Sequence, residues 1–72
     1  MASYKNFGGN SNIQAYEIGD TYIDVQFKGG SVYRYSYSSA GQMKVERMKE
    51  LALQGQGLNS YIMLNAKMDY EK

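Results

Sequence analysis

The stretch YIDVQFKGGSVYRYSY, residues 22–37, decides the expected fold. Its first six residues alternate apolar and polar side chains, and this period of two predicts a strand with one buried face and one face toward water. Glycines within the segment 28–31 permit the positive φ angles of a tight turn. The alternation returns in residues 32–37, where one face carries Tyr33, Tyr35 and Tyr37. The stretch therefore predicts an antiparallel β-hairpin.

A third strand is predicted before the hairpin. Apolar residues indicate that it starts at Ile13, with a break near Tyr16–Glu17, and Gly19-Asp20 supplies the turn into the next strand. Short turns between consecutive strands are typical of an antiparallel meander. The predicted sheet therefore has three strands.

Two helices are predicted after the hairpin. Ser38-Ser39 is the expected N-cap region of a helix that runs to about Leu53. The glycines in residues 54–57 end this helix, and a second helix is expected to begin near Leu58. The sequence therefore predicts an α+β fold, a three-stranded antiparallel β-meander followed by two α-helices packed on one face.

The length of 72 residues allows one domain, which we expect to span residues 13–68. A flexible N-terminal segment, residues 1–12, is expected before it, and residues 69–72 are expected to fray. No apolar run approaches the roughly 20 residues that span a bilayer, and no charged-then-apolar leader opens the chain. We therefore expect a cytoplasmic protein that does not contact a membrane.

The chain contains no His and no Cys, and its formal net charge is +1. Enzymes that use a Ser–His pair, a cysteine nucleophile or a His-ligated metal are therefore excluded. We expect no catalysis, no metal and no cofactor. Tyrosine is in excess, with 8 of the 72 residues.

The chain resembles the KTSC family, small domains found at the carboxy-terminal end of some lysyl-tRNA synthetases and as free-standing proteins. The residues that carry the resemblance are Ser11, Ile13, Val25, Phe27, Gly30, Tyr33, Tyr35, Gly55, Leu58, Asn59 and Ile62. The resemblance implies RNA binding, because domains of this family occur in the same chain as a tRNA synthetase. The chain is also similar to small bacteriophage proteins, and this similarity implies the sequestration of a small nucleotide signal.

The tyrosines of the predicted strand over residues 32–37 are candidate ligand-binding residues. Tyr33, Tyr35 and Tyr37 could stack on nucleobases, as aromatic residues of single-strand-binding sheets do. The alternative is that Tyr33 and Tyr35 pack beneath the helices, and Tyr37, at the strand end, is expected to be partly exposed. Arg34 could hold a phosphate with two hydrogen bonds, or it could pair with Asp24 on the neighbouring strand.

The glycine-rich segment before the second helix provides the other candidates. Backbone N–H groups at Gly55 and Gly57 could bind an anion, and Asn59 could hydrogen-bond a base edge or a ribose. The alternative is a structural connector in which Asn59 caps the second helix. Lys28-Gly29-Gly30-Ser31 could also cradle a phosphate, although hairpin formation alone explains its glycines.

The sequence therefore predicts a non-catalytic module that binds a nucleotide-type ligand, either RNA or a small nucleotide. A charge near zero favours the small ligand, because RNA binding depends on Lys and Arg contacts to several phosphates. The alternative function is a homo-oligomeric protein–protein interaction domain without a nucleotide ligand. In either case we expect a homodimer, because so small a core gains from further burial.

Overall fold

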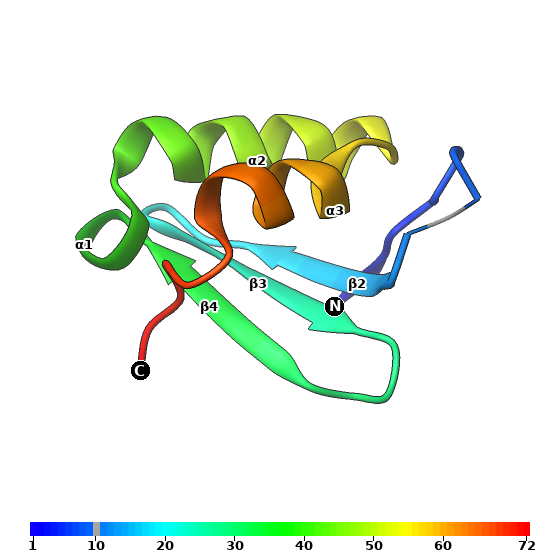
Figure 1. Ribbon diagram of the computed structural model, residues 1–72, viewed down its shortest axis with the longest axis horizontal. Helices are drawn as coiled ribbons and strands as arrows, with labels where there is room; N and C mark the ends of the chain where they lie inside the picture. The colour runs from blue at the N-terminus through cyan, green and yellow to red at the C-terminus, as the bar shows by residue number, and fades with distance from the viewer. Residues whose placement is uncertain (10) are drawn as a thin grey trace.

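The computed structural model describes residues 1–9 and 11–72, and it places one helical layer on one face of an antiparallel sheet (Figure 1). The sheet has the strand order β1-β2-β3-β4. Its strands are β1 (Ala2–Ser3), β2 (Ile13–Ile18), β3 (Tyr22–Phe27) and β4 (Val32–Ser36). The helical segments are α1 (Tyr37–Ala40), α2 (Gln42–Gln54), α3 (Leu58–Tyr61) and the π-helical turn η1 (Ile62–Ala66). The predicted α+β class is confirmed.

The sheet has four strands, so the prediction of three was wrong. The additional strand, β1, lies in the N-terminal segment that was expected to be flexible, and it pairs with β2 at Ala2↔Tyr16 and Ser3↔Ala15. The next residue, Tyr4, is buried, and its hydroxyl accepts a hydrogen bond from the Leu58 backbone N–H at 3.3 Å. Asn10, which also belongs to this segment, lies outside the described residues.

The sheet irregularity also differs from the prediction. The β2–β3 register shifts between Ile13 and Ala15, whereas the break was expected near Tyr16–Glu17. One extra residue at such a bulge changes the pairing without ending the strand.

The first predicted helix is divided in two. Ser36 caps α1, and its side chain and that of Ser39 bond each other's backbone N–H groups. Gly41 then adopts φ 91°, which ends α1 before α2 begins. The second helix begins at Leu58, as predicted, and continues into η1.

The core lies between the helical layer and the inner face of the sheet. Figure 1 shows α2 and α3 on the same side of the strands. Core side chains with essentially no exposed surface include Ile13, Ile23, Val25, Val45, Met48, Leu58 and Ile62. Each such burial contributes about 1.5–3 kcal/mol. No helix in the described part of the chain has the length and apolar character needed to cross a membrane.

Burial on the inner face decreases toward the β3–β4 turn. Along β3, Ile23 and Val25 are fully buried and Phe27 only partly. Along β4, Tyr35 is 2% exposed and Tyr33 is 37% exposed. The helical layer therefore leaves the end of the hairpin uncovered.

The C-terminal tail, for which the sequence predicts fraying, lies against this uncovered end. The Glu71 backbone N–H donates to the Arg34 carbonyl oxygen at 2.7 Å, and the Tyr70 ring packs on Tyr33. Lys44 of α2 holds Asp69 at 2.8 Å. Burial of an aromatic ring against apolar surface is favourable in free energy. This contribution exceeds the preference of the polar tail residues for solvent.

Gly55 provides a test of how the N-terminal segment is attached. It has φ 77°, and a Cβ atom there would lie 2.8 Å from Lys5 Cβ. Gly55→Ala is therefore expected to lower the free energy of unfolding by more than the roughly 1–2 kcal/mol that a left-handed alanine costs. Gly57→Ala is the matched control, because Gly57 has φ 83° but an added Cβ would be 3.4 Å from Leu51 Cδ2. Equal losses in chemical denaturation would contradict this prediction.

Alkaline unfolding provides a second test. Burial, with smaller contributions from Tyr33 and Tyr70, raises the pKa of Tyr35 from 10.0 to about 12. The neutral phenol is therefore favoured in the folded state, and its contribution to stability is complete below pH 10 and lost as the pH rises through about 12. Tyr35→Phe is expected to flatten this part of the stability–pH curve. The control, Tyr61→Phe, should retain the wild-type slope, and equal slopes for wild type and Tyr35→Phe would refute the prediction.

Candidate functional site

Two neighbouring hollows provide candidate binding surfaces on the described residues. The first, which we call the aromatic groove, has a volume of about 360 Å³ and is lined by Phe27, Lys28, Ser31, Tyr33, Tyr35, Met63, Lys67, Met68 and Tyr70. The second, which we call the polar cavity, has a volume of about 220 Å³ and is lined by Tyr4, Asn6, Gly8, Ser11, Gln56, Gly57, Asn59 and Ser60.

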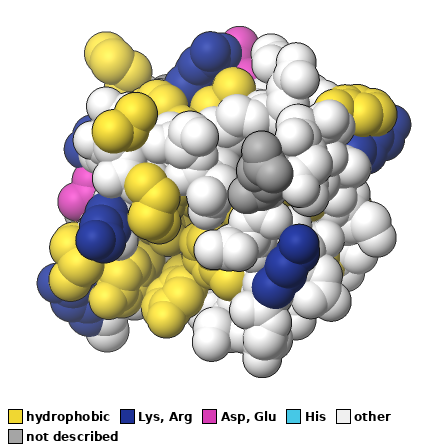
Figure 2. Space-filling view, turned by 45° about the vertical axis from the view of Figure 1, so that its right-hand side comes forward, with side chains coloured by type: hydrophobic (Ala, Val, Ile, Leu, Met, Phe, Trp, Pro, Cys, Tyr) yellow, Lys and Arg dark blue, Asp and Glu magenta, His cyan; other side chains and the backbone are white. Residues whose placement is uncertain are grey.

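The aromatic groove lies where the helical layer leaves the sheet uncovered. Tyr33 is in contact with two other rings, Tyr70 at 4.7 Å and Phe27 at 5.6 Å between centroids. Tyr35 lies deeper and meets the Tyr70 ring edge to face at 6.3 Å. Figure 2 shows hydrophobic side chains gathered at the lower left, with Lys or Arg side chains near them. The partly exposed rings give a flat aromatic molecule a surface on which to stack.

Two lysines border the aromatic groove. Lys28 follows β3 and Lys67 follows η1, and neither forms a salt bridge within residues 1–9 and 11–72. Four other cationic side chains do have carboxylate partners: Arg34, Lys44, Arg47 and Lys49. No carboxylate is among the described side chains that line the groove. Its positive charge is therefore available to an anion.

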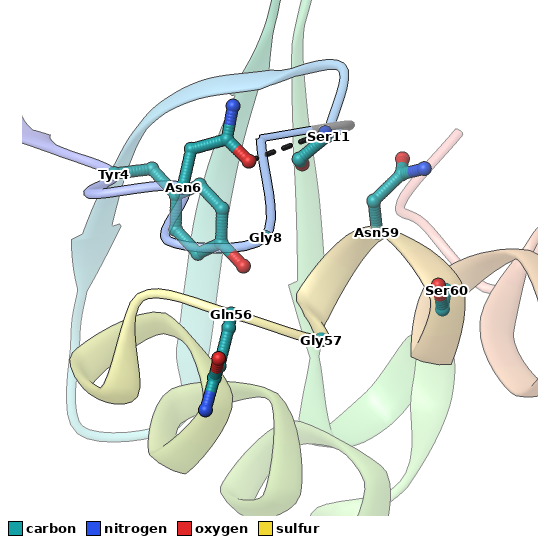
Figure 3. A pocket seen from close by; sticks show the side chains of 8 residues that line it. All are labelled: Tyr4, Asn6, Gly8, Ser11, Gln56, Gly57, Asn59 and Ser60. Carbon is teal, nitrogen blue, oxygen red and sulfur yellow. Dashed lines mark hydrogen bonds between the residues drawn. The ribbon is translucent and has the colours of Figure 1, made fainter.

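The polar cavity is formed by segments from the two ends of the chain. Figure 3 shows the N-terminal loop on one side and residues 56–60 on the other. Asn6 Oδ1 accepts a hydrogen bond from the Ser11 backbone N–H at 3.2 Å, and the Tyr4 hydroxyl accepts one from Leu58. Among the described side chains, none that lines this cavity is charged.

Asn59 is the predicted site residue whose polar groups are most available. Its side chain makes no hydrogen bond to any described residue, and α3 has no side-chain cap. In Figure 3 it extends from α3 toward the side on which Ser11 lies. The alternative interpretation of Asn59 as a helix cap is therefore not supported by this geometry. The carboxamide retains two donors and an acceptor.

The structure divides the seven predicted site residues into three groups. Tyr33 and Tyr35 line the aromatic groove, and Gly57 and Asn59 line the polar cavity. The remaining three, Arg34, Tyr37 and Gly55, line neither hollow.

Arg34 lies on the sheet face opposite the helices, where it pairs with Asp24. Its Nε donates to Asp24 Oδ1 at 2.7 Å, and its Nη2 donates to Oδ2 at 3.0 Å. The guanidinium also lies 3.9 Å from the Tyr22 ring centroid. Asp24 was predicted to face water, but it is buried because Arg34 covers it. Of the two alternatives for Arg34, the structure therefore shows the pair with Asp24 on the neighbouring strand.

Tyr37 and Gly55 have structural partners. Tyr37 belongs to α1 rather than to the strand, and its hydroxyl donates to Glu46 Oε2 at 2.6 Å, which raises the pKa of Tyr37. Tyr37 is partly exposed, as expected, and Tyr33 is more exposed than Tyr37. Gly55 is buried, and its N–H donates to the Leu51 and Ala52 carbonyl oxygens, so the group is not available to an anion.

Sequence reasoning missed several groove and cavity residues. Tyr70 and Lys67 lie near the C-terminus, and Tyr4 and Asn6 lie in the N-terminal segment, where no periodic pattern points to burial. The one available signal is an aromatic residue within each polar terminal segment. In the described ranges, no group of three or more His, Cys, Asp or Glu side chains is arranged to hold a metal ion.

Comparisons with known proteins give no relative from which a role could be transferred: no family model, curated protein or solved structure matches this chain.

Proposed function

We propose that this protein binds a small nucleotide without transforming it, with the base in the aromatic groove and the phosphate beside Lys28 and Lys67. The observation that carries the proposal is the combination of partly exposed aromatic rings with two lysines that have no carboxylate partner among the residues that the structure describes. Stacking of a base on an aromatic side chain contributes about 1–3 kcal/mol. A phosphate supplies the negative charge that the groove lacks.

The chemistry of the groove supports binding rather than catalysis. The chain contains no His and no Cys, and no carboxylate lines the groove within the described residues. The raised pKa of Tyr35, about 12, keeps its phenol neutral near pH 7, so it does not serve as a base there. The available groups are suited to stacking, hydrogen bonding and charge neutralisation.

A small ligand is favoured over RNA by the number of available cations. Only two lysines line the groove among the described residues, and the net charge of the chain is +1. An RNA-binding surface follows several phosphates with Lys and Arg. The resemblance to the KTSC family favours RNA, whereas the similarity to small phage proteins supports a role in sequestering a nucleotide signal.

A homodimer interface is a second candidate, favoured by exposed apolar side chains around the same groove. Met63 and Met68, which line the groove, are 44% and 58% exposed. Light scattering would give twice the chain mass of 8.2 kDa if this surface joins two copies, with no change of mass or melting temperature on adding nucleotides.

Binding of the four common nucleoside 5′-monophosphates, measured by NMR titration, tests the nucleotide proposal. We expect Tyr33→Ala to weaken binding of the best of them about tenfold or more, because one stacking surface is lost. Lys67→Gln should also weaken it and reduce its salt dependence. Arg47→Gln is the matched control, because it removes the same charge from an exposed pair with Glu50 on α2.

Three results would contradict the proposal. The first is that none of the four nucleotides binds at millimolar concentration. The second is that Arg47→Gln and Lys67→Gln weaken binding equally. The third is that a single-stranded RNA octamer binds much more tightly with a steep salt dependence, which would assign the groove to RNA.

A further inference from the structure

We infer that the natural ligand carries an uncharged hydrogen-bonding group esterified to its phosphate, and that this group occupies the polar cavity. The inference rests on the proposed function, and it extends the site from one hollow to two. Its basis is that residues 59–67 contribute to both hollows, which differ in chemistry.

The helical segment α3–η1 connects the two hollows. Asn59 and Ser60 line the polar cavity, and Met63 and Lys67 line the aromatic groove. These positions recur at intervals of three and four residues, so they follow one side of the helix. Four residues of helix rise about 6 Å, which is comparable to the distance from a base to the far side of its phosphate. A single ligand can therefore reach from one hollow into the other.

The opposite wall is also continuous. The Lys28 backbone N–H donates to the Asn12 carbonyl oxygen at 2.7 Å, and Phe27 pairs with Ile13 in the β2–β3 ladder. Ser11, which lines the polar cavity, is therefore close in space to Lys28, which lines the aromatic groove. Lys28 thus lies near the boundary of the two hollows, where a bridging phosphate would be held.

The lining of the polar cavity selects an uncharged group. It offers carboxamides from Asn6 and Asn59 and hydroxyls from Ser11 and Ser60. A second phosphate would find no cation among the described residues there. Hydroxyl-rich or amide-bearing groups match these donors and acceptors, since each carboxamide offers both. The second half of a dinucleotide and a sugar linked through phosphate share this chemistry.

The test compares three probes that all present one nucleoside and one singly charged phosphodiester. They are the methyl ester of the best-binding nucleoside 5′-monophosphate, the corresponding dinucleoside monophosphate and the corresponding hexose ester. We expect one or both extended probes to bind at least tenfold more tightly than the methyl ester, measured by calorimetry. The extended probe with the higher affinity identifies the second group as a nucleoside or a sugar.

Asn59→Ala is expected to abolish this preference and to change the affinity of the methyl ester less than twofold. Its melting temperature should equal that of the wild type, because the Asn59 side chain makes no hydrogen bond to the described part of the protein. Asn59→Asp, which keeps the shape but removes the two N–H donors of the carboxamide, should also remove the preference. Tyr33→Ala is the matched groove variant and should weaken all three probes alike.

The outcomes separate the two proposals. Equal affinities for the three probes, or a preference that persists in both Asn59 variants, would overturn the inference and leave the nucleotide proposal standing. Failure of every probe and every mononucleotide to bind would overturn both.

Discussion

The helical layer of this protein leaves the β3–β4 turn end of the sheet uncovered, and the candidate site depends on this incomplete cover. Ile23, Val25 and Tyr35 are sealed beneath the helices, whereas Phe27 and Tyr33 are only partly covered. Apolar surface left open at the end of a sheet is costly in water. The tail reduces that cost by placing Tyr70 on Tyr33, and the remaining opening is the aromatic groove.

The termini of the chain complete the site as well as the fold. Tyr4 is buried and bonded to Leu58, which orders the N-terminal loop opposite α3 and forms the polar cavity. Phe7 donates its N–H to the Gly55 carbonyl oxygen at 2.7 Å on the same side. Both hollows are thus made from segments distant in sequence, and α3–η1 contributes to both of them.

Charge is distributed so that the two faces of the sheet have different roles. On the outer face, Arg34 is bound to Asp24 and stacked on Tyr22, and the Arg34–Asp24 pair joins β3 and β4. Lys28 and Lys67 border the inner, aromatic side without a salt bridge among the residues described. A bidentate pair satisfies both partners, whereas an unpaired ammonium group retains its charge for a ligand. For this reason the arginine, although it was a candidate, contributes to the sheet and not to the groove.

The sequence by itself determined the hairpin, the α+β class and the start of the second helix, because alternation, turn glycines and capping residues act between neighbours in the chain. It also identified Tyr33, Tyr35, Gly57 and Asn59 as candidate residues. It did not determine which of the two hollows each of them lines. Only the tertiary structure decided that Tyr4 and Tyr70 pack on the core and the groove and that Arg34 is held by Asp24. It also decided which lysines have no partner. These contacts join positions as far apart in the sequence as Tyr4 and Leu58. Their free energy depends on residues that are distant in the chain, so a local sequence pattern does not indicate them.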